Sequence, residues 1–331
     1  MKKIFVRSPY FIEVDEIDQL EVKLEIYLWN KGTTEPTTPT YSITEKVPSA
    51  LQNKISLNVS NYAKDFIKPI APVTVTVPTE ENVNTWCYMR VVSYSDDVEV
   101  ADETFVCLNG YTNYLSGYNQ STTDAVVPLV NTDIKFQTSS GFNYINVWLE
   151  SNDYNWSGND DYVFTVASDG LWKLNYDYDA YSFSLFGGSD QFIIEAEQLC
   201  EPKYTPITCT FINRFGGWQY LTFFKANSQS IDVSSKDFNL LPNSVDYNVL
   251  QGQKQRFNFQ GKQKIKCNTG WVNENYSELI QDLLLSEIVL LDSKPAIVKS
   301  QSFDIKTHLK DKNINYEIEF EYNYGLINDV I

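Results

Sequence analysis

The sequence predicts a mainly β protein of several domains. The chain has 331 residues, more than one hydrophobic core usually organises, and 43% of them are hydrophobic. Its 22 Tyr, 19 Phe and 7 Trp far outnumber its 2 Met, a composition that favours pleated strands over helices. Short segments of alternating apolar and polar residues recur along the chain. We therefore expect an immunoglobulin- or fibronectin-like β-sandwich (1–115), an acidic β module (116–203) and a C-terminal β-rich α+β module with one amphipathic helix (204–331).

The first predicted domain is a succession of short strands. Apolar residues alternate with charged ones over 20–28, which predicts a strand with one buried face. The runs 86–94 and 98–108 are separated by a Ser-Asp-Asp cluster, which predicts a hairpin. A short helix or turn is expected near 62–66. About seven strands in all fit a sandwich.

The second predicted domain carries much of the negative charge. It is entered through a polar linker at 116–123 and has predicted strands at 145–149, 162–166 and 171–176. Residues 150–199 hold ten acids and one base, a net charge of 1 − 10 = −9 out of −17 for the chain. Two prolines in 201–206 mark the expected boundary before the third domain.

The third predicted domain begins with a hairpin, 207–212 and 218–225, turning at a Gly-Gly pair. One helix is expected after Asn275, which with Glu278 resembles a capping box and precedes apolar residues at helical spacing. Strict alternation over 314–323 predicts a long final strand with an acidic outer face.

Several classes of protein are disfavoured. The N-terminal apolar run ends at Arg7, so no export signal is expected, and no run is long enough to span a membrane. The net charge of −17 opposes binding to phosphate backbones or anionic lipid. Five cysteines without a CxxC motif favour reduced thiols: Cys87, Cys107, Cys200, Cys209 and Cys267.

The residues point to no enzyme. A single histidine, His308, lies in a polar stretch, and zinc would need several closely spaced Cys or His ligands. We therefore predict no catalytic residues, no cofactor and no metal. Two alternatives stay open: a glycosidase pair at Asp177 and Asp179, and a cation held by loop oxygens from Asn152, Asp153, Asn159, Asp160 and Asp161.

A basic segment is the main candidate for an interface. Five bases and no acid alternate with two phenylalanines between 254 and 266. We expect this segment to contact the acidic middle domain, with Asp177 and Asp179, or the tail strand of a neighbouring copy. A nucleic-acid groove and a merely solvated hairpin are the alternatives. The candidate residues are Lys254, Arg256, Lys262 and Lys264, within a set that also holds Lys266, Phe257 and Phe259.

The turn Asn213-Arg214-Phe215-Gly216-Gly217-Trp218 has two interpretations of equal weight. Arg214 and Trp218 are residue types that anchor interfaces. Asn and Gly equally suit a tight turn, and the two aromatic rings could seal a core.

This turn, in the segment FINRFGGWQYLTFF (211–224), and the later segment beginning TGWV at Thr269 resemble those of tail ring and hub (baseplate-type) structural proteins of crAss-like tailed bacteriophages. The resemblance implies a non-enzymatic virion protein without cofactor. Its partners would be copies of itself in a ring and other tail proteins: portal-side rings, hub and fibres. It would be assembled in the host bacterial cytoplasm and located in the virion tail. Neither a membrane nor nucleic acid is implied as a partner.

The residues leave a second function open. A carbohydrate-binding or adhesin-type β-sandwich protein would use exposed aromatic side chains. The candidates are Tyr154, Trp156, Tyr176 and Tyr178.

Overall fold

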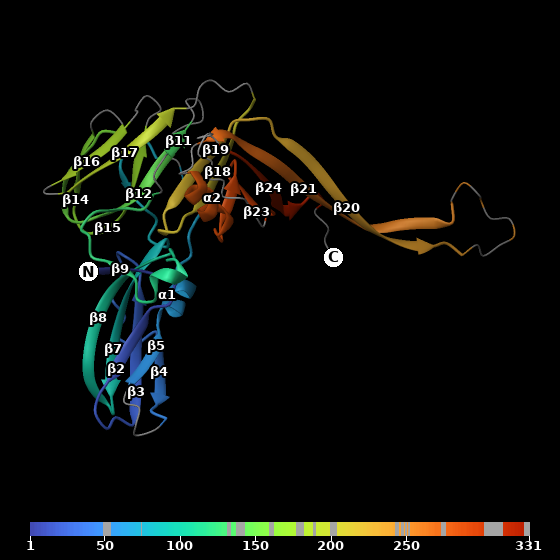
Figure 1. Ribbon diagram of the computed structural model, residues 1–331. Helices are drawn as coiled ribbons and strands as arrows, with labels where there is room; N and C mark the ends of the chain where they lie inside the picture. The colour runs from blue at the N-terminus through green and yellow to red at the C-terminus, as the bar shows by residue number, and fades with distance from the viewer. Residues whose placement is uncertain are drawn as a thin grey trace. The chain divides into compact units, whose positions relative to one another are not determined.

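The computed structural model divides into two compact units: Met1–Cys200 with Phe211–Tyr220, and Glu201–Thr210 with Leu221–Ile331. Strands account for 57% of the structure and helices for 8%, so the prediction of a mainly β protein is confirmed (Figure 1). The structure describes residues 1–48, 54–73, 75–130, 134–136, 143–158, 162–176, 182–187, 190–198, 204–241, 245, 248, 250, 252–272, 276–300 and 314–327.

The first unit begins with a six-stranded sheet in the order β4-β3-β7-β8-β1-β9. A separate antiparallel pair, β2 with β5, and a short helix, α1, accompany it. The four apolar residues of β3 at even positions 22–28 are all buried, as their alternation predicts. They join residues of β1, β7 and α1 in one core. The bounds are β1 Lys2–Phe5, β2 Phe11–Asp15, β3 Glu21–Trp29, β4 Tyr41–Lys46, β5 Lys54–Asn58, α1 Ser60–Phe66, β7 Trp86–Ser95, β8 Val98–Leu108, the 3₁₀ turn η1 Tyr114–Ser116 and β9 Ser121–Thr122.

The predicted hairpin at Asp96 and Asp97 is confirmed. Both residues have positive φ, 46° and 66°, as a tight turn between twisted antiparallel strands requires. The Asp96 carboxylate also accepts hydrogen bonds from the backbone N–H groups of Leu20 (3.0 Å) and Glu21 (2.9 Å). The turn therefore also holds the start of β3.

Two further sheets complete the first unit. One has the order β10-β12-β15-β6 and the other β11-β17-β16-β13-β14. Strand β6 precedes the predicted boundary at residue 115, yet its backbone pairs with β15. The division into three domains stays a prediction. The bounds are β6 Thr79–Glu80, β10 Val127–Pro128, β11 Ile134–Phe136, β12 Asn143–Leu149, β13 Asn152–Trp156, β14 Tyr162–Val166, β15 Gly170–Tyr176, β16 Ser182–Gly187 and β17 Asp190–Gln198.

The second unit contains most of a seven-stranded sheet in the order β19-β18-β22-β23-β24-β21-β20. Strands β18 and β19 are divided between the two units, because Phe211–Tyr220 belongs to the first. The bounds are β18 Ile207–Ile212, β19 Trp218–Phe223, β20 Ser228–Asn239, β21 Lys254–Val272, α2 Tyr276–Leu284, β22 Val289–Leu291, β23 Lys294–Val298 and β24 Ile314–Gly325.

Two predicted elements of this unit are confirmed. Helix α2 buries the stripe formed by Tyr276, Leu279, Ile280 and Leu283; its proposed cap, Asn275, lies outside the described residues. Strand β24 buries its apolar residues and exposes the intervening ones over most of its length. Among the helices of the described residues, none is long and apolar enough to cross a bilayer.

Candidate assembly surface

Strands β20 and β21 continue past the rest of their sheet as a two-stranded ribbon (Figure 1). Their pairing runs from Ser228 opposite Lys266 to Asn239 opposite Lys254, whereas β24 pairs with β21 only over 262–272. We call 228–233 with 261–266 the ribbon root and 234–239 with 254–260 the distal ribbon. An isolated pair of strands is only marginally stable in water. The distal ribbon is therefore suited to a partner that covers it.

A bulge separates the two halves of the ribbon. Ser234 lies opposite Gln260 and Lys236 opposite Phe257, so two residues of β21, Asn258 and Phe259, face the single β20 residue between. Asn258 has a φ of 52°, a left-handed conformation that asparagine adopts more readily than most residues. Such a bulge bends and twists a strand pair. It leaves β20, the outer strand, regular.

An apolar strip runs along one face of the ribbon root. Ile265 and Cys267 are buried on this face. Alternation places Ile231 and Val233 on the same face further out, where they are 60% and 64% exposed. The apolar face of the sheet therefore continues from buried residues to exposed ones along the ribbon root.

The other face of the root carries a ladder of ion pairs. Lys266 pairs with Glu317 at 2.5 Å, and Lys262 with Glu321 at 3.0 Å. Lys264 contacts Asp232 at 2.6 Å and Glu319 at 3.7 Å. The hydrogen bond to Asp232 raises the pKa of Lys264, and the one from Lys262 lowers the pKa of Glu321.

This ladder bears directly on the sequence prediction. Lys262 and Lys264 were expected to meet acids of a neighbouring copy, but the acids of β24 and β20 in the same chain already pair with them. Because most members are solvent-accessible, the pairs add little to stability. The acids offset the positive charge of the lysines in the ribbon root. The remaining net positive charge of the ribbon therefore lies in the distal ribbon.

The distal ribbon combines cations with exposed aromatic rings. Phe238 and Phe257 are 43% and 46% exposed, and their rings meet edge to face with centroids 5.6 Å apart. Lys254 is exposed, and Arg256 contacts Asp237 at a loose 3.6 Å. Rings and guanidinium groups of this kind are common in the centres of protein interfaces.

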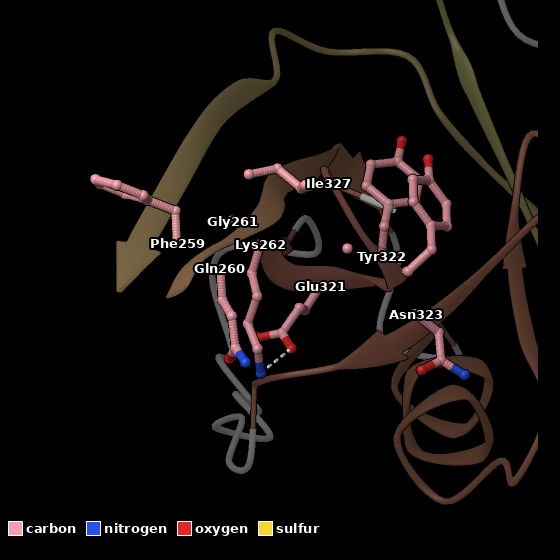
Figure 2. A pocket seen from close by; sticks show the side chains of 10 residues that line it. Phe259, Gln260, Gly261, Lys262, Glu321, Tyr322, Asn323 and Ile327 are labelled. Carbon is pink, nitrogen blue, oxygen red and sulfur yellow. Dashed lines mark hydrogen bonds and ion pairs between the residues drawn. The ribbon is translucent and has the colours of Figure 1, made fainter. Parts of the chain in front are cut away.

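A cleft of about 360 Å³ lies where β21 and β24 separate (Figure 2). Its walls include the Lys262–Glu321 ion pair, Phe259 and the rings of Tyr322 and Tyr324, whose centroids are 5.4 Å apart. A second cleft of about 600 Å³ shares the two tyrosines. Apolar rings beside a fixed ion pair suit a peptide segment or another amphipathic ligand.

The turn that contains Arg214 and Trp218 has a structural role. Trp218 is 2% exposed, and its backbone N–H donates to the Asn146 side-chain oxygen at 2.7 Å. The Arg214 guanidinium lies over the ring of Phe215, 4.9 Å from its centroid. The burial of Trp218 favours the interpretation of this ring as a core residue.

Asp177 and Asp179, the acidic candidates, lie outside the described residues. The aromatic platform proposed for an adhesin was wrong at three positions. Tyr154, Trp156 and Tyr176 are 3% exposed or less, because they pack together in the core between β12, β13 and β15. Tyr178 is not among the described residues.

The thiols of the described residues are poor nucleophiles. Cys87, Cys107, Cys209 and Cys267 are buried and free. Burial raises the pKa of Cys107 and Cys209, and that of Cys267 to about 12, which disfavours the reactive thiolate.

Only part of the predicted cation loop lies among the described residues, and the histidine does not. Asp153 accepts a hydrogen bond from the Thr165 hydroxyl at 2.6 Å, and Asn152 accepts one from the Asp153 backbone at 2.8 Å. Asn159, Asp160, Asp161, His308 and Cys200 lie outside the described residues. Within the part of the chain that the structure describes, no three His, Cys, Asp or Glu residues gather as a metal site would require.

Comparison of the chain with protein-family models and with curated proteins finds no match.

The first unit should lose stability at alkaline pH. Burial raises the pKa of Tyr144, Tyr176 and Tyr220, so the folded unit keeps these protons where the unfolded chain releases them. Their contribution to the free energy of unfolding is complete below the unfolded pKa of about 10 and falls as pH rises above it. In Tyr144→Phe, we expect the slope of this free energy against pH, measured in urea from pH 8 to 11, to be shallower by up to about 1.4 kcal/mol per pH unit.

The matched control is Tyr114→Phe, because Tyr114 is 94% exposed. It should keep the wild-type slope. Equal slopes in both variants would contradict the assignment of the alkaline loss to buried phenols.

Proposed function

We propose that this chain is a non-enzymatic structural protein of a bacteriophage virion, an oligomeric component of a tail ring, hub or baseplate. It would connect the portal-proximal tail to fibres or to neighbouring rings. The observation that carries the assembly part is the distal ribbon, which exposes Phe238 and Phe257 on one face, where alternation also places Lys236, and Lys254 and Arg256 on the other. The assignment to a phage tail rests on the resemblance of the segments 211–224 and 269–291.

The ribbon's exposed surface supports this proposal in physical terms. A two-stranded ribbon with exposed rings is only marginally stable by itself. Burying those rings against a partner would stabilise the ribbon, because it would remove apolar surface from water. Exposed apolar area next to charged side chains is typical of a surface that binds a partner protein. The charges fix the orientation in which the two proteins meet. The partners proposed are copies of the chain and other tail proteins, with assembly in the host cytoplasm and nucleic acid disfavoured by the net charge.

Sedimentation velocity of the purified chain tests this proposal, with negative-stain imaging of the same samples. We expect defined multimers or rings at high protein concentration. They should loosen between about 50 mM and 500 mM salt, because screening weakens contacts between exposed charges. A monomer at every concentration and salt would contradict a ring of copies.

A carbohydrate-binding or adhesin-type protein is the second candidate function. One observation favours it: in the larger cleft, Tyr204 and Tyr324 are partly exposed beside the side chains of Asn227, Gln229 and Gln263. Rings and amides are groups that bind sugars. Glycan binding that is lost in Tyr324→Ala, by a chain that sediments as a monomer, would favour this candidate over the first.

A further inference from the structure

The ribbon is a cationic element in an acidic protein. Strands β20 and β21 together hold six bases and two acids, a net charge of +4, so the remainder of the chain carries −17 − 4 = −21. At the root, acids of β24 offset the lysines. In the distal ribbon, Lys236, Lys254 and Arg256 face one acid, Asp237, which leaves a net charge of +2.

A surface of opposite character lies on β8 in the first unit. Strand β1 pairs with β8 only over 105–108, so among the described strands 98–104 is paired on one side alone, by β7. This open edge carries three acids, Glu99, Asp102 and Glu103, and no base. Two apolar side chains, Val98 and Val100, are 66% and 38% exposed there.

The acids on this edge differ in their local partners. Arg90 binds Asp102 with two hydrogen bonds of 2.7 Å. Glu103 contacts Lys2 only at 4.0 Å, with both side chains about half exposed. Glu99 and Glu103 are therefore the acids best suited to a second partner.

We propose that the distal ribbon of one copy docks on the β8 edge, residues 98–104, of a second copy. This inference rests on the proposed function and names its contact. The two surfaces match in both charge and apolar character: three bases and three phenylalanines on the ribbon face three acids and two valines on the edge. A polyanion such as nucleic acid would meet the same cations but would be repelled by the remaining −21.

The contact also accounts for a ring. Ribbon and edge are different surfaces, so each copy offers one of each and the contact is heterologous. Such contacts run head to tail, and they close into a ring or extend as a filament according to the rotation between copies.

Paired charge reversals test the contact. The ribbon variant is Lys254→Glu with Arg256→Glu, and the edge variant is Glu99→Lys with Glu103→Lys. Each variant alone places like charges opposite one another, so we expect self-association to weaken by about tenfold or more in sedimentation velocity. Mixed in equal amounts, the two should associate again, because each then offers the other a complementary surface.

The control is Lys46→Glu with Lys68→Glu, which changes the net charge as the ribbon variant does, at exposed positions that belong to neither segment. It should associate like the wild type. Circular dichroism and the urea midpoint show whether every variant folds.

Each remaining outcome has a definite meaning. A wild type that assembles while both reversals leave association unchanged would overturn this contact but keep the proposed function. Weakening that mixing does not reverse would also overturn it, because net charge alone would then explain the effect. A ribbon variant that loses binding to single-stranded DNA and sediments like the wild type would point to nucleic acid. A wild type that never assembles would remove both proposals.

Discussion

Replacing Asn213 by alanine is expected to lower the free energy of unfolding of the first unit by about 4 kcal/mol. The side chain is fully buried and uses its whole hydrogen-bonding capacity. Its oxygen accepts from the backbone of Phe215 (3.0 Å) and Gly217 (3.1 Å), and its nitrogen donates to Leu129 (3.0 Å) and Gln219 (3.2 Å). Alanine removes all four of these hydrogen bonds at once. The loss of a partner for a buried polar group costs about 1–3 kcal/mol, partly offset by rearrangement.

Tryptophan fluorescence in urea measures this effect, because six of the seven tryptophans lie in the first unit. The matched control is Asn113→Ala. Asn113 accepts one backbone hydrogen bond, from Leu115 at 3.1 Å, at an exposed turn where water can replace it. We expect a loss of at most about 1 kcal/mol there. Equal losses of unfolding free energy in the two variants would contradict the prediction. The four buried hydrogen bonds of Asn213 would then stabilise the unit no more than the single exposed one of Asn113.

Replacing Gly216 by alanine should destabilise the same unit by about 3 kcal/mol. Two costs add. Gly216 has a φ of 84°, which costs a residue with a Cβ about 1–2 kcal/mol. The new Cβ would also lie 2.8 Å from the Asn109 nitrogen and 2.9 Å from the Gly110 nitrogen. These are backbone atoms, and a 2.7 Å hydrogen bond from Tyr111 to the Arg214 carbonyl holds the two segments together, so neither can easily move.

Gly32→Ala separates the two costs. Gly32 has nearly the same φ, 82°, in a turn closed by a hydrogen bond from Thr33 to the Asn30 carbonyl, but the methyl group of an alanine there would have no atom within 4 Å beyond its chain neighbours. It should lose only the conformational cost, about 1–2 kcal/mol. If both alanine variants shift the urea midpoint equally, the close approach at Gly216 is not tight in solution.

These two residues, Asn213 and Gly216, explain why the turn at 213–218 resists interpretation from sequence. Asn and Gly indicated a tight turn, and that prediction is confirmed by the hydrogen bond between Gly216 and the Asn213 carbonyl at 3.1 Å. The contacts with Asn146 and Leu129 lie about 70 to 85 residues away in the chain. No local pattern encodes them, so the core and interface interpretations of Trp218 could not be separated.

The basic segment shows the same limit. Its charges and rings were evident in the sequence, and so was the acidic face of the last strand. That Lys262 pairs with Glu321, 59 residues away, follows from the register of β21 on β24. Only the sheet order could therefore show that Lys262 and Lys264 already pair within the chain. Lys254 and Arg256 lie beyond the residues that pair with β24, so they remain candidates for an interface.

The sequence by itself determined the β-rich class, the buried face of β3, the β7–β8 hairpin, helix α2 and the alternation of β24. These features depend on neighbours within a few residues, through side-chain period and turn conformation. Only the tertiary structure decided that Tyr154, Trp156 and Tyr176 are core residues. It alone revealed that β6 joins β15 and that β20 and β21 outrun their sheet. These outcomes depend on which distant strands pair and where the pairing stops, and alternation of apolar and polar residues carries no information about either.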